Sequence, residues 1–409
     1  MFYFAYWIVH FCIFEENFAT MDDLFEKQNI LLKSIKTNFR RYLYDKIAWN
    51  SRMIGIIGAR GVGKTTMLLQ YIKSNLNPDD ALYVSADDLY FGQHTLYSLA
   101  DEFYKNDGKH LFIDEVHKYK NWSQELKNIY DSFPSLKITF TGSSILDIIK
   151  GSSDLSRRAL IYKLNGLSFR EYLKLYHDKQ VSVYSLNEIL NQKIELQDIS
   201  HPLPLFKDYL KRGYFPFGLE SEMELRLDQI IIQTLEGDIP QYANLNVGTT
   251  KKLKHLLSII AKSVPFKPNF SKIAEIIKVS RNSLDDYFFY MEKAGLIIQL
   301  RQETKGIRSL GKVSKVYLNN PNLLFNLGAG NTNPGNLRET FFYNQMMVNH
   351  QVFSSKEADF IIENKTFEIG GKNKDQKQLP KDSNSYLVKD GIEYGYKNVI
   401  PLWAFGLNY

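Results

Sequence analysis

Apolar runs and amphipathic stretches alternate through the first half of the chain. Short apolar runs predict strands at Met53–Ile57, Ala81–Ser85, Leu111–Ile113, Lys137–Phe140 and Ala159–Leu164. Stretches with helical periodicity lie between them and begin near Gly63, His94, Asn121 and Ser144. This alternation predicts an α/β fold: a parallel sheet with helices on both faces.

The pattern changes after Ser168. Residues 168–250 are typical of helices, and residues 251–318 contain a helix–turn–helix pattern followed by two strands. Asn, Gly and Pro are frequent from Asn319 to Asn333, which predicts a linker. One helix and several short strands are expected over residues 336–409. We therefore expect a core at 21–167, a helical lid or linker at 168–250, a helix–turn–helix module at 251–318 and a small α/β module at 336–409.

The first twenty residues differ from the rest. Met1–Phe14 is almost wholly apolar and is shorter than the roughly 20 residues that span a bilayer. It contains no Lys or Arg, so it lacks the basic start of a secretory signal peptide. Met21 is followed by a polar sequence that is typical of the N-terminus of a cytosolic protein, so we expect residues 1–20 to be a non-native or flexible leader. A membrane-touching anchor is the less favoured alternative. No later segment is apolar enough to span a membrane.

Composition narrows the class of protein. A chain of 409 residues suggests two to three domains at roughly 150 residues each. With 44% hydrophobic and 23% charged residues, the chain is too apolar for wholesale disorder. Its single cysteine, Cys12, excludes an intramolecular disulfide framework and a multi-cysteine zinc site, and favours the cytoplasm. A net charge of +6 permits contact with nucleic acid without arguing for it.

The clearest chemical motif follows the first strand. It has the form G-x-x-x-x-G-K-T and comprises Gly58, Ala59, Arg60, Gly61, Val62, Gly63, Lys64, Thr65 and Thr66. Glycines let backbone N–H groups approach phosphates, and the following helix N-terminus favours negative charge. Lys64 is expected on the β and γ phosphates, and the Thr65 hydroxyl on Mg²⁺.

An apolar strand that ends in two acids supplies the rest of a nucleotide site. Asp114 is expected to hold Mg²⁺ together with Thr65, and Glu115 to polarise the attacking water. The next strand ends in hydroxyls, among which Ser143 would report the γ-phosphate while also capping a helix. Further on, Arg158 would either stabilise transition-state charge, in this or a neighbouring subunit, or form a surface or interdomain ion pair.

With these motifs the chain resembles a large group of prokaryotic AAA+ type P-loop ATPases that carry an extra C-terminal region. The group's motifs have counterparts at Asp114–Trp122, Thr141–Ser144, Leu155–Ala159, Gly166–Glu171 and Gly213–Pro216. Arg158 falls on the group's arginine, whereas Arg157 replaces a glycine and Gly166 a proline. The resemblance implies a cytosolic protein that binds ATP, whose client is usually unknown.

Residues 270–300 resemble a winged helix-turn-helix. Arg281 and Asn282 would contact bases from the start of the second helix, but Asp285 and Asp286 follow directly and would repel phosphates. We favour a structural or partner-binding module, and contact with double-stranded DNA stays open as the alternative.

The C-terminal module resembles the restriction-endonuclease-like pattern, with an acid on one strand and E-x-K on the next. Asp359 and Glu368 straddle a hairpin, and Glu339 on the preceding helix is a further acid. The lysine position holds Gly370, and Lys372 lies two residues on. Two carboxylates and a lysine are the groups of a metal-dependent nuclease. Because the lysine is displaced, we expect a degenerate nuclease fold.

Taken together, the sequence predicts a protein that binds ATP, hydrolyses it with Mg²⁺ and couples its nucleotide state to movement of the C-terminal modules. The alternative is an ATP-gated protein that binds or cleaves DNA with the nuclease-like module. A protein client is the other expected kind of partner. An Arg158 that acts on a neighbouring subunit would require a homo-oligomer.

Overall fold

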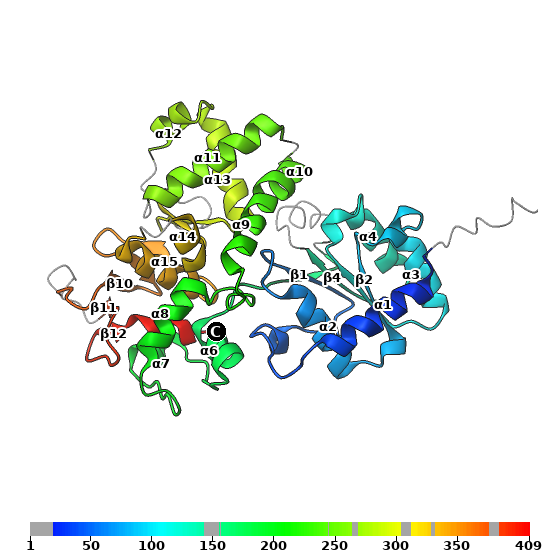
Figure 1. The fold of residues 1–409 in the computed structure, drawn as a ribbon, viewed down its shortest axis with the longest axis horizontal. Coiled ribbons are helices and arrows are strands. Elements are labelled where there is room, and N and C mark those ends of the chain that lie inside the picture. Colours follow the sequence, from blue (N-terminus) through cyan, green and yellow to red (C-terminus); the bar gives the residue numbers. More distant parts are fainter. Residues whose placement is uncertain are drawn as a thin grey trace, which may run out of the picture.

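The structure is a computed structural model that describes residues 19–142, 155, 157–243, 245–263, 269–303, 312–328, 332–375 and 384–409. Figure 1 shows three parts: a sheet surrounded by α1 to α4, a group of helices that includes α10 to α13, and a second sheet near α6 to α8 and α15. Helix α9 lies between them (Figure 1).

A five-stranded parallel sheet forms the first part, as the alternation of strands and helices predicts. Its strands are β1 (Met53–Ile57), β2 (Ala81–Ser85), β3 (His110–Asp114), β4 (Lys137–Gly142) and β5 (Leu160–Lys163). They lie in the order β2-β3-β4-β1-β5, and every neighbouring pair is parallel. The carboxyl ends of β1, β3 and β4 therefore meet at one edge, where ligands of such sheets bind.

Helices pack on both faces of this sheet. They are α1 (Met21–Ser34), α2 (Lys64–Asn75), α3 (Leu96–Lys105) and α4 (Trp122–Ser132), with the 3-10 turns η1 (Tyr44–Lys46), η2 (Pro78–Asp80), η3 (Leu89–Gly92) and η4 (Val116–Lys118). Leu68 of α2 joins the apolar core on one face, whereas Leu99 of α3 and Leu126 of α4 join the core on the other. The helix expected near Ser144 lies outside the described residues.

Helix α1 closes the edge of the sheet beside β2. The side chain of the fully buried Gln28 donates to the Ala81 carbonyl at 3.0 Å and accepts from the Tyr83 N–H at 2.6 Å. These bonds satisfy groups of an edge strand that would otherwise be open to another chain. A capping box between Thr20 and Asp23 begins the helix.

The predicted helical segment divides between two neighbours. It contains α6 (Phe169–His177), α7 (Leu186–Leu190), α8 (Pro202–Arg212), α9 (Met223–Gln233), the π-helical turn η5 (Thr234–Asp238) and α10 (Ile239–Ala243). Helices α6 and α8 pack against the 3-10 stretch η8 (Leu402–Leu407) near the C-terminal sheet. The run from α9 to α10 instead reaches the first sheet, where Asp238 bonds to Arg60.

The helix–turn–helix pattern corresponds to real elements. They are α11 (Val247–Ser263), α12 (Phe270–Ile276), α13 (Arg281–Lys293) and the antiparallel strands β6 (Ile297–Arg301) and β7 (Val313–Leu318). Ile273, Leu284 and Phe288 are buried, as the helical spacing predicts. Membership of the winged-helix class stays a prediction.

The C-terminal module is a second five-stranded sheet with helices beside it. Its elements are α14 (Pro321–Leu327), α15 (Pro334–Met346), β8 (Phe353–Ser354), β9 (Phe360–Ile362), β10 (Lys365–Gly370), β11 (Ser385–Lys389), β12 (Val399–Pro401) and η8. The strand order is β12-β11-β10-β9-β8, with β9 and β10 forming the expected antiparallel hairpin. The first strands are antiparallel and the last ones parallel.

One expectation is wrong: residues 319–333 are not simply a linker, because they contain α14. The Asn320 side chain accepts from the Leu323 N–H at 3.1 Å, and Pro321 takes the first helical position. Leu323 and Leu324 are buried. Asn and Pro are loop residues, but they are equally the residues that begin helices.

Within the described part of the chain, no helix combines the length and the apolar character needed to cross a bilayer.

Candidate active site

The loop after β1 has the backbone that a phosphate site needs. Gly61 and Gly63 have φ angles of 78° and 96°, which favour glycine. A Cβ on Gly58 would lie 2.3 Å from the Leu164 carbonyl oxygen. Helix α2 begins at Lys64, so its N-terminus points into the loop.

Lys64 is held against its own loop. Its Nζ donates to the carbonyls of Gly58 and Ala59, each at 3.0 Å. Burial lowers the pKa of this ammonium, while the nearby charges of Glu115 and Asp114 oppose the effect. The predicted contact between Lys64 and the β and γ phosphates would replace bonds to neutral carbonyls with bonds to an anion.

Thr65 and Asp114, predicted to share a metal, are direct neighbours. The Thr65 hydroxyl donates to Asp114 Oδ2 at 2.5 Å, and the Tyr83 hydroxyl donates to the same oxygen at 2.9 Å. Thr141 of β4 donates to Oδ1. Asp114 is buried, with 2% of its surface exposed. Sequence reasoning missed Tyr83, because its contact with Asp114 joins residues 31 positions apart on two neighbouring strands.

This donor set fits Mg²⁺. The ion usually takes one or two carboxylates and completes its shell with water and substrate phosphates. Thr65 and Asp114 offer oxygen ligands beside the loop that would hold those phosphates. Among the described residues, no group of three or more His, Cys, Asp or Glu forms a cage for a metal.

Glu115 lies at the mouth of the site in an unusual conformation. Its φ is +54°, in the left-handed region that few non-glycine residues adopt. Its Oε2 lies 3.8 Å from Arg60 Nη1 and 3.6 Å from His117 Nε2. Burial lowers the pKa of His117. The Glu115 backbone N–H donates to Thr141 Oγ1 at 3.2 Å.

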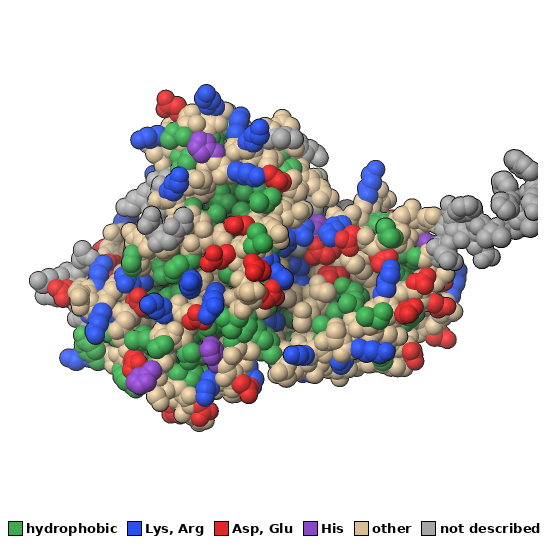
Figure 2. Space-filling view, in the orientation of Figure 1, with side chains coloured by type: hydrophobic (Ala, Val, Ile, Leu, Met, Phe, Trp, Pro, Cys, Tyr) green, Lys and Arg blue, Asp and Glu red, His purple; other side chains and the backbone are tan. Residues whose placement is uncertain are grey.

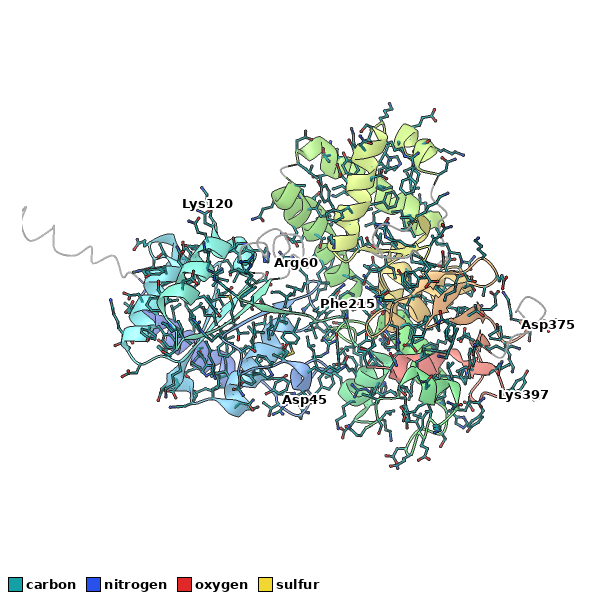
Figure 3. All side chains as sticks on the ribbon, turned by 180° about the vertical axis from the view of Figure 1, so that it is seen from behind. Asp45, Arg60, Lys120, Phe215, Asp375 and Lys397 are labelled. Atoms are coloured by element: carbon teal, nitrogen blue, oxygen red, sulfur yellow. The ribbon has the colours of Figure 1, made fainter. Side chains whose placement is uncertain are left out.

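The cleft beside this loop has a volume of about 360 Å³ and is shared between two parts of the molecule. The core contributes Arg60, Gly61, Gly63, Lys64, Thr65, Thr66 and Glu115. The helical segment contributes Pro216, Phe217, Glu220 and Arg226. Figure 3 shows Arg60 and Phe215 where the core faces the rest of the chain.

Residues outside the motifs line this cleft or bond to residues that line it, and sequence reasoning missed most of them. Asp238 binds Arg60 with two hydrogen bonds of 2.9 and 2.8 Å. Arg226 pairs with Glu220 at 2.7 Å and lies 5.5 Å from the Phe217 ring centroid. Only the Gly-x-x-Pro turn that ends at Pro216 gave a signal, through the resemblance to ATPases.

A buried ion pair between Arg41 and Glu171 supports the phosphate loop. Arg41, 5% exposed, donates through Nη1 to the Val62 carbonyl and through Nε to Glu171 at 2.9 Å. The Tyr42 N–H also donates to Glu171, at 2.7 Å. Glu171 belongs to a stretch that the resemblance identified, whereas no sequence signal marked Arg41.

Arg158 does not reach the site within this chain. It precedes β5, at the amino edge of the sheet, opposite the edge that holds Lys64. Its guanidinium bonds to Asp131 at 2.9 and 3.0 Å. A role on a neighbouring subunit stays a prediction. Ser143 lies outside the described residues, and its neighbour Thr141 contacts both Asp114 and Glu115.

The C-terminal acids lie among lysines that the sequence did not single out. Lys315 Nζ lies 2.9 Å from both Glu339 Oε2 and Asp359 Oδ1. Lys374, rather than Lys372, pairs with Glu368. Lys372 is exposed.

The glycine in the lysine position explains this pairing. A Cβ on Gly370 would lie 2.6 Å from the Cβ and Cγ atoms of Lys374. The bare backbone at Gly370 thus makes room for Lys374 to cross the strand and reach Glu368. Nuclease activity of this cluster stays a prediction.

Comparison with known proteins covers parts of the chain. Residues 50–173 match a family model described as an AAA domain, and residues 203–333 match a domain family of unknown function. The uncharacterized protein MJ1637 of Methanocaldococcus jannaschii is 30% identical over 281 residues, which are 63% of this chain and 58% of that protein. The match therefore spans less than two thirds of that relative. The uncharacterized protein MJ1544 of the same organism is 26% identical over 79% of this chain and 73% of its own length.

Solved structures with distant likeness include the Walker-type ATPase PABY2304 of Pyrococcus abyssi, with 13% identity, a TM-score of 0.44, and coverage of 72% of this chain and 98% of that one. AMPPCP-bound DnaA from Aquifex aeolicus has 14% identity and a TM-score of 0.27, over 67% of this chain and 91% of that one. The AAA domain match to residues 50–173 and the parallel sheet with its glycine loop support an AAA-like ATPase fold there, with ATP binding and hydrolysis as the general activity.

Proposed function

We propose that this protein is a Mg²⁺-dependent ATPase whose nucleotide state moves the helical segment and the modules that follow it. The observation that carries the proposal is the contact between Thr65 and Asp114, 2.5 Å apart, beside the Lys64 loop and Glu115. A hydroxyl and a carboxylate in contact at the ends of two elements are the metal-binding half of a nucleoside triphosphate site.

The chemistry divides among four side chains. Lys64 would leave the carbonyls of its loop and bind the β and γ phosphates. Thr65 and Asp114 would hold Mg²⁺, which supplies neutralisation of phosphate charge. Glu115, which is held near Arg60 and His117, would orient the attacking water and accept its proton.

The coupling to other modules rests on the walls of the cleft. Phe217 and Arg226 line it together with Lys64 and Thr65, so a bound nucleotide would touch both the core and the helical segment. Helix α9 carries Arg226 and continues through η5 and α10 towards α11. A shift of α9 on nucleotide binding would therefore reach the module that contains α12 and α13.

Two variants test the ATPase proposal. Lys64→Ala should abolish tight ATP binding, because it removes the main positive charge for the phosphates. Glu115→Gln should keep ATP bound but slow its turnover by about 10²-fold or more. ATP affinity and turnover are measured by titration and by phosphate release. Lys33→Ala and Glu102→Gln, at exposed positions on α1 and α3, serve as matched controls. Unchanged affinity in Lys64→Ala would contradict the proposal.

Contact with DNA is a second candidate function, favoured by two exposed residues of types that often contact bases. Arg281 and Asn282 begin α13 on the surface. Figure 2 shows Lys and Arg side chains on the upper part of the molecule, where Figure 1 labels α11 to α13. Other basic groups there already have partners: Lys254 pairs with Glu236, and Lys252 with the Lys278 carbonyl.

An assay of ATP turnover with and without double-stranded DNA tests whether DNA or a protein is the client. If DNA is the client, DNA should stimulate turnover, and Arg281→Ala should weaken binding in fluorescence anisotropy, with a salt dependence typical of phosphate contacts. No binding at 50 mM salt would leave a protein client as the partner.

A further inference from the structure

The side chain of Arg60 joins the phosphate loop to the helical segment. Its Nε and Nη2 donate to Asp238 Oδ2 and Oδ1 at 2.9 and 2.8 Å. This two-pronged geometry fixes the plane of a guanidinium as well as its position. The two residues are 178 positions apart in the chain.

The bond to Asp238 leaves one nitrogen of Arg60 directed elsewhere. Nη1 lies 3.8 Å from Glu115 Oε2, the group expected to orient water. A guanidinium carries five N–H donors, and the pair with Asp238 uses two of them. Arg60, Lys64, Thr65 and Glu115 line the same cleft. The third nitrogen thus lies among the groups that would surround a γ-phosphate.

We propose that Arg60 contacts the γ-phosphate through Nη1 and stabilises the charge that develops during hydrolysis, while Asp238 positions it. This inference rests on the proposed ATPase function. In the assisted step the water oxygen bonds to the γ-phosphorus, the bond to the bridging oxygen of ADP breaks, and Glu115 accepts a proton from the water. Arginine contacts of this kind neutralise the oxygens of the transferring group.

Asp238 is suited to hold Arg60 in place. It is 4% exposed, and it ends the π-helical turn η5 between α9 and α10. Turns of this kind are rare and occur often at functional sites. Because Asp238 belongs to the helical segment, the position of that segment sets the orientation of Arg60. The arrangement links the segment to the chemistry through a contact within one chain.

Arg60 fits this role better than the arginine that the sequence singled out. Arg158 lies at the opposite edge of the sheet and bonds to Asp131 there. The side chain of Arg60 is 21% exposed and is already turned into the cleft. Sequence reasoning placed Arg60 in the phosphate loop, but it assigned no role to the side chain.

The test compares Arg60→Ala, Asp238→Asn and the double variant in the full chain. We expect Arg60→Ala to lower kcat about 10²-fold or more. It should weaken binding of the ATP analogue AMPPCP about tenfold and leave ADP affinity within about twofold, because only the analogue carries the third phosphate group. Asp238→Asn should lower kcat about tenfold with little change in KM. Arg212→Ala, which removes half of an exposed pair with Asp208, is the matched control and should match the wild type.

The double variant separates phosphate contact from simple tethering. Arg60→Ala leaves the buried Asp238 without its partner, and a loss that arose only from that charge would recover in Arg60→Ala/Asp238→Asn. We expect no recovery of kcat. Recovery, or equal losses of ADP and AMPPCP affinity, would overturn the proposal. If Arg60→Ala fails to fold by circular dichroism, Arg60→Lys should fold and keep only part of the turnover, and full turnover there would overturn it.

Measurements on the wild type distinguish a failure of the Arg60 proposal from a failure of the ATPase proposal on which it rests. A wild-type protein that binds neither ADP nor AMPPCP would remove the ATPase proposal itself. A wild type that hydrolyses ATP, beside an Arg60→Ala variant of equal kcat, would overturn the role of Arg60 alone.

Discussion

At the scale of single residues, the Asp114 carboxylate is held by hydroxyls from three elements. Thr65 of α2 and Tyr83 of β2 donate to one oxygen, and Thr141 of β4 donates to the other. Burial and the negative charge of Asp114 raise the pKa of Tyr83, so its hydroxyl stays protonated and remains a donor. When Thr65 turns to a metal, Tyr83 and Thr141 are still able to fix the carboxylate.

We expect Tyr83→Phe to raise the Mg²⁺ concentration that half-saturates turnover by about three- to tenfold. The change removes one donor to a buried carboxylate, an effect of about 1 kcal/mol. ADP affinity without Mg²⁺ should stay the same. Turnover is measured across a Mg²⁺ titration, with Tyr97→Phe, which loses an exposed bond to Ser132, as the control. An unchanged Mg²⁺ dependence would mean that Tyr83 only packs.

Local sequence patterns identify some of the site residues and miss others. Lys64, Thr65, Asp114 and Glu115 follow from a loop motif and a strand that ends in acids. Tyr83, Arg41 and Asp238 do not, because their roles depend on neighbours distant in sequence. The Arg41–Glu171 pair joins residues 130 positions apart, and a single sequence carries no signal for such a contact.

At the scale of elements, apolar runs predicted all five strands of the first sheet. Four of these strands are mostly buried, and buried parallel strands are continuous in their hydrophobicity. The fifth, β5, lies at the edge of the sheet with Leu160 and Ile161 exposed. The segment at α14 shows the limit of the method. Its Asn and Pro residues indicate an interruption but do not say whether a loop or a helix follows. The sequence also did not show that the helical segment packs against two different parts of the molecule. Amphipathic spacing shows which face of a helix is buried, but it does not show which element covers that face.

The hairpin β6–β7 is tied to the C-terminal module by Lys315. Its ammonium lies between Glu339 of α15 and Asp359, with side-chain exposures of 17%, 14% and 16%. Burial and the charge of Asp359 raise the pKa of Glu339. A positive charge from another element therefore lies among the acids of the nuclease-like pattern.

Lys315→Met should destabilise the protein by about 2 kcal/mol, between the values for surface and fully buried pairs. The loss should shrink towards pH 5. Because the folded-state pKa of Glu339 is raised, protonation of this carboxyl stabilises the fold at low pH, and that stabilisation is lost as pH rises through the raised pKa. Removing Lys315 raises the pKa of Glu339 further. The variant therefore gains more stability from protonation than the wild type does, and the difference between them is smaller at low pH. Urea unfolding at pH 5 and pH 8 measures this, with Lys105→Met at an exposed pair as control. A pH-independent loss would contradict the charge argument.

At the scale of the whole molecule, the phosphate loop is joined to the C-terminal module through a few buried groups. Arg41 holds the Val62 carbonyl and Glu171, which caps α6 beside Ser168. The Ser168 hydroxyl donates to the Tyr409 carbonyl oxygen at 2.7 Å, and the Tyr409 ring lies 4.7 Å from that of Tyr42. Nucleotide binding and the packing of the C-terminal module therefore share one support.

Glu171→Gln should reveal this shared support. It leaves the buried Arg41 guanidinium without its counter-charge, which should lower the free energy of unfolding by about 3 kcal/mol. Glu188→Gln is the matched control, because Glu188 caps α7 beside Ser185 in the same way but on the surface, and it should cost about 1 kcal/mol or less. Chemical denaturation measures both variants.

Nucleotide affinity then separates stability from the shape of the loop. Arg41→Met/Glu171→Gln removes both charges and should recover much of the lost stability, since no buried charge is left without its partner. It should not recover ADP affinity, because the bond from Arg41 to the Val62 carbonyl is gone and the loop loses its support. Equal recovery of stability and ADP affinity would show that Arg41 contributes to folding alone.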